Sequence, residues 1–479
     1  MTTLPPGGPP GTGTSGSGAG ESPEPGRGGA EATRATAAPG LAGNHRPAPS
    51  DPSAARPRPP LVTELRRGLG PWTGAAVALT VLVAMYGKAP AWQGRWSDAT
   101  DLLHLAAGLL GGPLALAAGC RQGGRDRRRG TAELWESVPR SPLRRLLIAA
   151  APSALWPAAG VLLADAVGLL ATRPYVSGGR PALALLLADA VAVGSLGALG
   201  HVVGRLVPWR LTAPVLGIVG YAGLAAGTYT LSAARWLSPA ADSSTAWMRP
   251  VWWFAPASMA WTAGLACAAL LACGARTVRP RALALVPLAV AVAAAGLVLR
   301  LPPEDGPWRR DPAATRAVCD GGVPRVCVTV LDGRLLPAVS AALAPVNERL
   351  RGLPGAPARW AVGPVEPRRG DVQIADGAHA PVRGRLTRPD IFRHAAVGQL
   401  LARACDDSAL PRRGEERAAL VHLAVHEWLA PAPPGHGPGL SGAQEHLDRL
   451  RAKAPAAQRA YLARYLAADR CRPEEVPVP

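Results

Sequence analysis

The chain has 479 residues, of which 52 are lysine or arginine and 33 are aspartate or glutamate, giving a formal net charge of +19. Such a surplus is typical of nucleic-acid-binding proteins, but here the arginines lie beside apolar runs and not on polar helices interleaved with aromatic residues. The position of the arginines therefore excludes nucleic acid as the expected partner. The mean hydropathy of the chain is +0.11 although both of its ends are polar, which indicates an apolar middle.

The first 60 residues form a tract of proline, glycine, serine and alanine. This tract has no apolar run near its start, so it predicts no secretory signal peptide. It also has too few large apolar side chains to offset the conformational entropy lost on folding. We expect residues 1–60 to be a disordered cytoplasmic tail in front of a transmembrane domain over residues 61–300.

Apolar runs bounded by charge or proline predict the membrane-spanning segments. A helix needs about 20 mainly apolar residues to cross roughly 30 Å of hydrocarbon. Seven runs meet this requirement, at about residues 71–87, 102–120, 146–171, 181–204, 211–234, 253–274 and 282–299. The predicted fold is an all-α polytopic membrane protein of the cell membrane with about seven transmembrane helices.

The arginines predict the orientation of these helices, because basic residues resist translocation across a membrane. They are concentrated before the first span and in every second loop after it, and eight of them lie between Arg121 and Arg145 alone. This side is predicted to be cytoplasmic. An odd number of spans then places residues 301–479 outside the cytoplasm.

Four cysteines lie in the region placed outside, namely Cys319, Cys327, Cys405 and Cys471. An oxidising compartment favours an even number of cysteines that can pair. We expect disulfides between Cys319 and Cys327, across a short loop with turn-forming residues, and between Cys405 and Cys471. The alternative is four reduced, buried thiols in a cytoplasmic domain.

The region after residue 300 is predicted to be a small α+β extracytoplasmic domain. Short segments at residues 326–330, 359–365 and 371–374 have the composition of strands. Helical periodicity is present at residues 335–353, 390–405 and 415–429, and two short helices follow Ser441.

His422, His426 and Glu427 form an HxxxHE pattern on one of these helices. Two histidines one turn apart can bind zinc. Zinc peptidases of the HExxH type have a glutamate directly after the first histidine to activate the metal-bound water, and Leu423 occupies that position here. We expect structural or surface histidines, no metal or cofactor, and no enzymatic activity, with a membrane-tethered hydrolase as the weaker alternative.

The loop between the second and third spans has the most informative sequence of the chain, RDRRRGTAELWESVPRSPLRR from Arg125 to Arg145. It predicts a short cytoplasmic helix. Thr131 can cap its N-terminus, Glu133 lies where the helix dipole favours a negative charge, and Pro139 ends it. The apolar residues on one face of this helix are Leu134, Trp135 and Val138.

This loop resembles that of the permease subunits of type-2 ABC exporters, in which a charged run precedes Gly-Thr-x-Glu-Leu and a Ser-x-Pro stretch. The residues that carry the resemblance lie mainly within 129–142 and are Gly130, Thr131, Glu133, Leu134, Ser137 and Pro139. An amphipathic segment with Leu61, Leu65 and Leu69 before the first span is similar to the interfacial helix of that family. The resemblance implies that the loop docks on a separate ABC ATPase subunit, and it admits a second copy of the chain or a second permease as a further partner.

The function that this resemblance implies is that of a permease-like subunit acting on an unknown substrate. Lys88 and Lys453 are each followed by alanine, so neither belongs to a Walker loop and ATP hydrolysis falls to the partner. The family usually has six spans with both termini inside, so the seventh span and the external domain are additions. The alternative is a non-transporting membrane anchor or sensor whose external domain binds a ligand or an envelope partner.

Ionisable residues inside spans are costly in a bilayer and mark candidate functional sites. Asp165 and Asp189 are expected at similar depths in the third and fourth spans, and Asp101 and His104 lie near the outer end of the second. These four residues can line a polar vestibule that faces outward. The alternative is that each carboxylate meets water, a serine or a backbone group and has no transport role. His201, near the inner end of the fourth span, is expected to meet lipid headgroups.

Overall fold

The computed structural model describes most of the chain from residue 60 onward, with short gaps. The described residues are 60–66, 68–130, 141–241, 246–275, 277, 281–304, 306–375, 381–402, 414–433, 442–469 and 471–479. The tail predicted to be disordered, up to residue 59, and the central part of the predicted docking loop lie outside the described residues.

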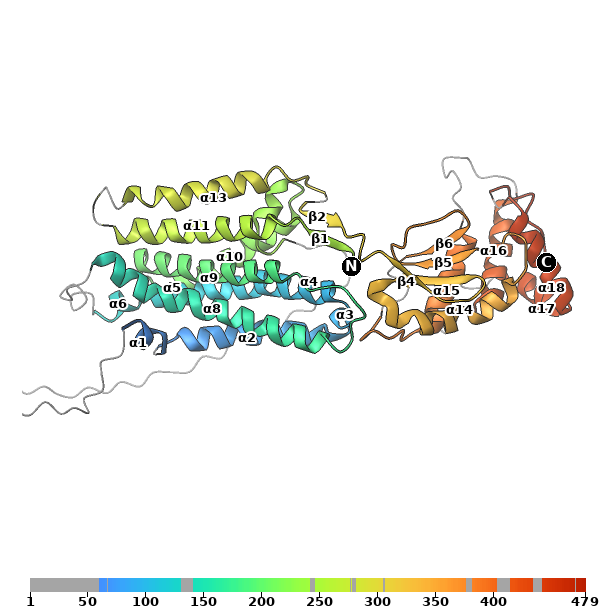
Figure 1. Ribbon diagram of the computed structural model, residues 1–479, viewed down its shortest axis with the longest axis horizontal. Coiled ribbons are helices and arrows are strands. Elements are labelled where there is room, and N and C mark those ends of the chain that lie inside the picture. Colours follow the sequence, from blue (N-terminus) through green and yellow to red (C-terminus); the bar gives the residue numbers. More distant parts are fainter. Residues whose placement is uncertain are drawn as a thin grey trace, which may run out of the picture. The chain divides into compact units, whose positions relative to one another are not determined.

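The helices between residues 60 and 300 run side by side in a bundle (Figure 1). The long ones are α2 (Gly70–Gly87), α4 (Trp96–Ala106), α5 (Gly112–Gly123), α8 (Pro142–Thr172), α9 (Leu183–Leu206), α10 (Thr212–Tyr229), α11 (Phe254–Gly274) and α13 (Leu285–Val298). The short elements around them are α1 (Pro60–Arg66), α3 (Ala89–Trp92), α6 (Arg125–Arg128) and the 3-10 helix η2 (Ala233–Leu237).

Five helical segments of the described chain are long and apolar enough to cross a membrane, which supports the predicted membrane class. They are Gly70–Gly87, Trp96–Gly123, Pro142–Thr172, Leu183–Leu206 and Phe254–Gly274. Helix α10 has 18 residues and α13 has 14, and they occupy the two other predicted spans. Because α13 is shorter than the about 20 residues that usually cross a bilayer, the count of seven spans stays a prediction.

The second predicted span contains a π-helical turn, η1 (Ala107–Gly111), between α4 and α5. Pro113 has no N–H and cannot donate a hydrogen bond to the turn before it, and the wider turn lies at this point. Single π-helical turns are frequent at functional sites. This one begins three residues after His104.

Glycines bring α5 and α9 into backbone contact. A Cβ atom at Gly204 would lie 1.9 Å from the carbonyl oxygen of Cys120, and one at Gly200 would lie 2.0 Å from that of Leu116. Small residues spaced four apart allow this close approach between membrane helices. Helix α9 also packs against α8 and α11, so it lies at the centre of the bundle.

The arginine distribution makes the orientation directly testable. Reporters fused after Gly123 and Arg279 should be active only in the cytoplasm, and those fused after Pro174, Asp242 and Pro312 only outside it. The measurement is a paired phosphatase and fluorescent-protein fusion assay in cells. A cytoplasmic signal after Pro312 would mean that the number of spans before it is even, and the external placement of the C-terminal domain would be wrong.

The C-terminal region, from residue 301, is a domain of helices around a small sheet, as its mixed periodicity predicted. The sheet has the order β3 (Ala317–Cys319), β4 (Arg325–Thr329), β5 (Arg359–Val362), β6 (Asp371–Ile374). Strand β3 is antiparallel to β4, and β4, β5 and β6 are parallel. The helical elements are η3 (Val330–Leu335), α14 (Leu336–Leu350), α15 (Pro389–Leu401), α16 (Glu415–Leu429), α17 (Gln444–Ala452) and α18 (Pro455–Ala467).

Two short strands join segments far apart in the sequence. Strand β1 (Met248–Pro250) precedes α11 and pairs antiparallel with β2 (Trp308–Arg310), which follows α13. A further hydrogen bond from Val251 N to Pro307 O, at 2.8 Å, extends the pairing. This pairing holds Trp308, which is 8% exposed, against the helix bundle.

Candidate functional site

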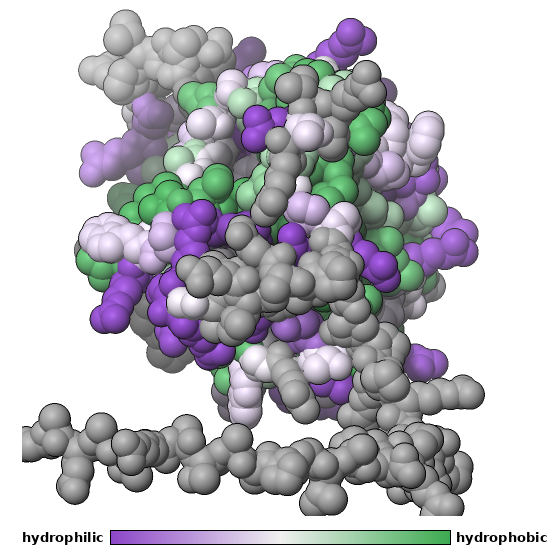
Figure 2. All heavy atoms as spheres, turned by 90° about the vertical axis from the view of Figure 1, so that its left-hand side faces the viewer, coloured by the Kyte–Doolittle hydropathy of each residue, from purple (hydrophilic) through white to green (hydrophobic). Residues whose placement is uncertain are grey.

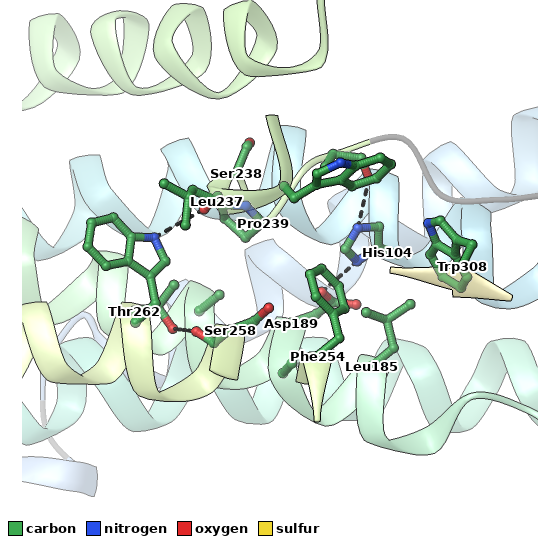
Figure 3. A pocket seen from close by; sticks show the side chains of 15 residues that line it. His104, Leu185, Asp189, Leu237, Ser238, Pro239, Phe254, Ser258, Thr262 and Trp308 are labelled. Atoms are coloured by element: carbon green, nitrogen blue, oxygen red, sulfur yellow. Dashed lines mark hydrogen bonds and ion pairs between the residues drawn. The ribbon is translucent and has the colours of Figure 1, made fainter. Parts of the chain in front are cut away.

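A polar cluster lies inside the bundle, built from three helices. His104 of α4 and Asp189 of α9 are 6% and 3% exposed, and Asp165 of α8 is 4% exposed. Nδ1 of His104 lies 2.6 Å from Oδ1 of Asp189, and Nε2 lies 3.0 Å from the carbonyl oxygen of Ala241 (Figure 3). Among the described residues, both oxygens of Asp165 and Oδ2 of Asp189 have no hydrogen-bond partner.

Local sequence explains how the segment before β1 reaches His104. A Cβ atom at Gly108 would lie 2.5 Å from the carbonyl oxygen of Pro239 and 2.8 Å from Cα of Ala240. The missing side chain lets this segment approach the π-helical turn, and the carbonyl of Ala241 then meets the imidazole. Neither the turn nor this approach is predictable from hydropathy.

A small cavity borders the His104–Asp189 pair. Its volume is about 20 Å³, which is room for about one water molecule. The side chains around it include Leu185, Trp236, Phe254, Ser258, Thr262 and Trp308 (Figure 3).

A larger hollow lies next to this cavity, at the end of the bundle that we call the domain end because it contacts the C-terminal domain. Its volume is about 760 Å³. Leu185 and Trp308 line both spaces, so these two side chains lie between them. The charged residues that line the larger hollow are Asp101, Arg180, Arg249, Asp311 and Arg316.

Three of the four residues predicted to form a polar vestibule, His104, Asp165 and Asp189, interact inside the bundle. Asp101 lines the larger hollow, whereas His104 and Asp189 line the small cavity. His201, predicted to meet lipid headgroups, is instead 3% exposed and its Nδ1 lies 3.2 Å from Oγ of Ser153. The prediction for His201 was wrong because depth along a helix does not reveal which face of the helix is buried.

The domain end contacts the C-terminal domain through a buried ion pair that the sequence did not reveal. Arg95, just before α4, donates two hydrogen bonds to the carboxylate of Asp332 in η3, at 2.8 and 2.9 Å. The Arg95 guanidinium also lies 5.1 Å from the ring centroid of Trp247, and Thr329 donates to Asp332 at 3.0 Å. The two charged residues are 237 positions apart in the chain, so only the fold unites them.

The opposite end of the bundle, which we call the loop end, carries a basic hollow of about 760 Å³. Hydrophilic side chains gather on this face (Figure 2). The polar residues that line the hollow are Arg121, Gln122, Arg125, Arg128, Arg129 and Arg210. Of the predicted docking loop, Gly130 is described and has a positive φ of 65°, whereas Thr131, Glu133, Leu134, Trp135, Ser137 and Pro139 lie outside the described residues.

The HxxxHE residues of α16 are engaged in hydrogen bonds within the C-terminal domain. His422 lies 2.8 Å from the hydroxyl of Tyr465, and His426 donates to the carbonyl of His394 at 2.8 Å. Glu427 accepts a hydrogen bond from Ala432 N at 3.0 Å. Burial lowers the pKa of His426 below its ordinary value, because the charged form loses hydration. Across the described ranges, no group of three or more His, Cys, Asp or Glu could hold a metal ion.

The described cysteines of the C-terminal domain are disulfide-bonded. Cys319 and Cys327 are paired across β3 and β4, with a Cα separation of 4.1 Å, which confirms that prediction. Cys471 is also disulfide-bonded. Its predicted partner Cys405 lies outside the described residues, so that pairing stays a prediction.

Comparison with known proteins finds no family model, no curated protein and no solved structure that matches this chain. The function must therefore be argued from the chain's own geometry.

Proposed function

We propose that the chain is the membrane-embedded, permease-like subunit of an ABC transporter and works with a separate ATPase. The observation that carries the proposal is the way in which both flanks of the 131–140 loop are built into the helix bundle. A docking loop transmits force only if the segments on either side of it are fixed to the spans that must move.

The first flank is linked to the short helix α1. Nη2 of Arg125, at the start of α6, lies 3.4 Å from Oε2 of Glu64 in α1. Helix α1 is in turn held on α8, because Nε1 of Trp156 donates to the carbonyl of Leu65 at 2.8 Å. Displacing the start of the loop would therefore shift α1 and α8 together.

The second flank runs directly into α8. Oγ of Ser141 accepts a hydrogen bond from Arg144 N at 3.4 Å, which caps the first turn of the helix. Helix α8 has 31 residues and carries Asp165 among its buried residues. A partner bound at the loop would thus act on the helix that leads to the polar cluster.

Substitutions in the loop test the partner. Glu133→Arg and Leu134→Asp should leave membrane insertion unchanged but weaken binding of the ATPase subunit, because one reverses a charge and the other places a charge on the apolar face of the predicted helix. Loss of one central contact of an interface costs about 2 kcal/mol or more, which is roughly a 30-fold loss of affinity. The measurement is co-purification of a Walker-loop ATPase with tagged full-length protein from its native membrane.

The control is Glu348→Arg, a charge reversal on the C-terminal domain at a side chain that is 68% exposed. It should co-purify the ATPase as the unmodified chain does. Equal recovery of the ATPase with both loop variants would reject the docking role.

A second candidate function, a non-transporting anchor or sensor, is favoured by the Arg95–Asp332 pair. This pair joins the C-terminal domain to the start of α4, so that ligand binding to the domain can be passed to the bundle. The same pull-down separates the two candidates. A preparation from the native membrane that contains no ATPase would favour the sensor.

A further inference from the structure

The bundle contains a buried carboxyl group that forms no hydrogen bond with the described residues. Asp165 is 4% exposed, and neither of its carboxyl oxygens has a hydrogen-bond partner in the part of the chain that the structure describes. Oδ2 of Asp189 lacks a partner as well. An ionised carboxylate inside a membrane protein is strongly disfavoured unless a cation or hydrogen-bond donors compensate it.

Among the described residues, no cation donates a hydrogen bond to Asp165. Helices α2, α10 and α11 contain no Asp, Glu, His, Lys or Arg. The charged groups that act on Asp165 are Asp189 and His104, and Asp101 acts in turn on His104. The other charged residues on the helices packed against α8, and on α8 itself, are Glu64, Arg66, Asp98, Arg121, Arg144, Arg145 and Arg205.

The hydrogen bonds of His104 determine how many protons the pair holds. A carbonyl oxygen only accepts, so Nε2 donates to Ala241. One further proton then lies between Nδ1 and Oδ1 of Asp189, on either atom. The pair is electrically neutral in both arrangements, and it cannot compensate a negative charge on Asp165.

We propose that Asp165 and the His104–Asp189 pair form an intramembrane proton-binding site, in which Asp165 holds a proton that exchanges with water from the domain end. Binding adds one H⁺ to a carboxylate oxygen and release returns it to water, so the step needs no oxidant or reductant. The proposal does not depend on the ATPase, because it follows from the unpartnered oxygens and the neutral pair.

The cavities supply the route for this proton. The small cavity has room for about one water molecule and borders His104 and Asp189, whose Oδ2 is free to accept a hydrogen bond. Leu185 and Trp308 line both this cavity and the larger hollow. The route that we infer for the proton runs from the hollow past Leu185 and Trp308 to Asp189, and then to Asp165, whose carboxylate interacts electrostatically with that of Asp189.

Infrared spectroscopy of the full chain in lipid nanodiscs tests the site, because a protonated carboxyl group has a carbonyl band separate from that of a carboxylate. The unmodified chain should show a buried carboxylic-acid band at neutral pH that shifts in D₂O. Asp165→Asn, which is nearly isosteric and uncharged, should lose this band. Asp165→Glu should restore a carboxylic-acid band at a shifted frequency. Glu348→Gln is the matched control and should leave the band unchanged, because the side chain of Glu348 is 68% exposed on the C-terminal domain.

Three outcomes would overturn the proposal. The first is the absence of the band in the unmodified chain at neutral pH. The second is a carboxylic-acid band that persists at full intensity in Asp165→Asn. If that variant does not fold, the equivalent outcome is a band in Asp165→Glu at the same frequency as in the unmodified chain. The third is loss of the band when sodium replaces choline at constant pH, which would make the site a sodium site. A band that does not shift in D₂O would reject the water route.

Discussion

Gly204→Ala is expected to abolish accumulation of the folded protein, although it adds a single methyl group. The new Cβ would lie 1.9 Å from the carbonyl oxygen of Cys120, a backbone atom that cannot rotate away. Overpacking against side chains costs about 1 to 3 kcal/mol, and a clash with backbone in a rigid helix should exceed this range. Helices α5 and α9 would have to separate, and α9 is the helix that carries Asp189. The measurement is the yield of monodisperse protein in gel filtration of detergent extracts.

The matched control for this variant is Gly223→Ala in α10. A Cβ at Gly223 meets nothing within 4 Å, and alanine is the better helix former by about 1 kcal/mol. This variant should be as stable as the unmodified chain or slightly more so. A normal yield of Gly204→Ala would show that α5 and α9 are not in backbone contact.

Asp332→Ala should lower the stability of the protein by about 3 to 5 kcal/mol, the usual cost of removing one partner from a buried ion pair. Arg95 and Asp332 have side chains that are 6% and 4% exposed. Truncating Asp332 leaves the guanidinium charge buried without its carboxylate. We expect a lower midpoint of thermal unfolding and faster proteolysis between the bundle and the C-terminal domain.

The double variant Arg95→Met with Asp332→Leu should be more stable than Asp332→Ala, because it removes both charges and fills the space with apolar side chains. Glu348→Ala is the control on the surface. It breaks the Arg351–Glu348 pair, whose side chains are 66% and 68% exposed, and such pairs contribute about 0 to 1 kcal/mol. If Asp332→Ala cost no more than Glu348→Ala, the contact between bundle and domain would be absent in solution.

The hydrophobic periodicity of the sequence predicted the bounds of helices and strands well where one face of a single segment is buried. Helix α16 and strand β6 have the predicted bounds, residues 415–429 and 371–374, because each packs one regular face against the core of the C-terminal domain. Strands β1, β2 and β3 have three residues each. They were missed because so short a segment has no period to detect, and its strand geometry is imposed by the partner strand.

The candidate site was only partly predictable for a related reason. Asp101, Asp165, Asp189 and His104 could be recognised because a charge in an apolar run is costly, but their grouping could not. The grouping depends on how helices α4, α8 and α9 pack against one another. In the structure Asp101 lines the larger hollow, whereas His104 and Asp189 line the small cavity.

The sequence by itself determined the membrane class, the mixed content of the C-terminal domain and the Cys319–Cys327 disulfide, because each follows from composition or from neighbours close in the chain. Tertiary structure alone decided which ionisable groups meet. The Arg95–Asp332 pair spans 237 positions and the His104–Asp189 pair spans 85. The physical reason is that helix packing determines which buried charges lie together. In this bundle glycines allow the helices to pack closely, and their contacts are visible only in the folded structure.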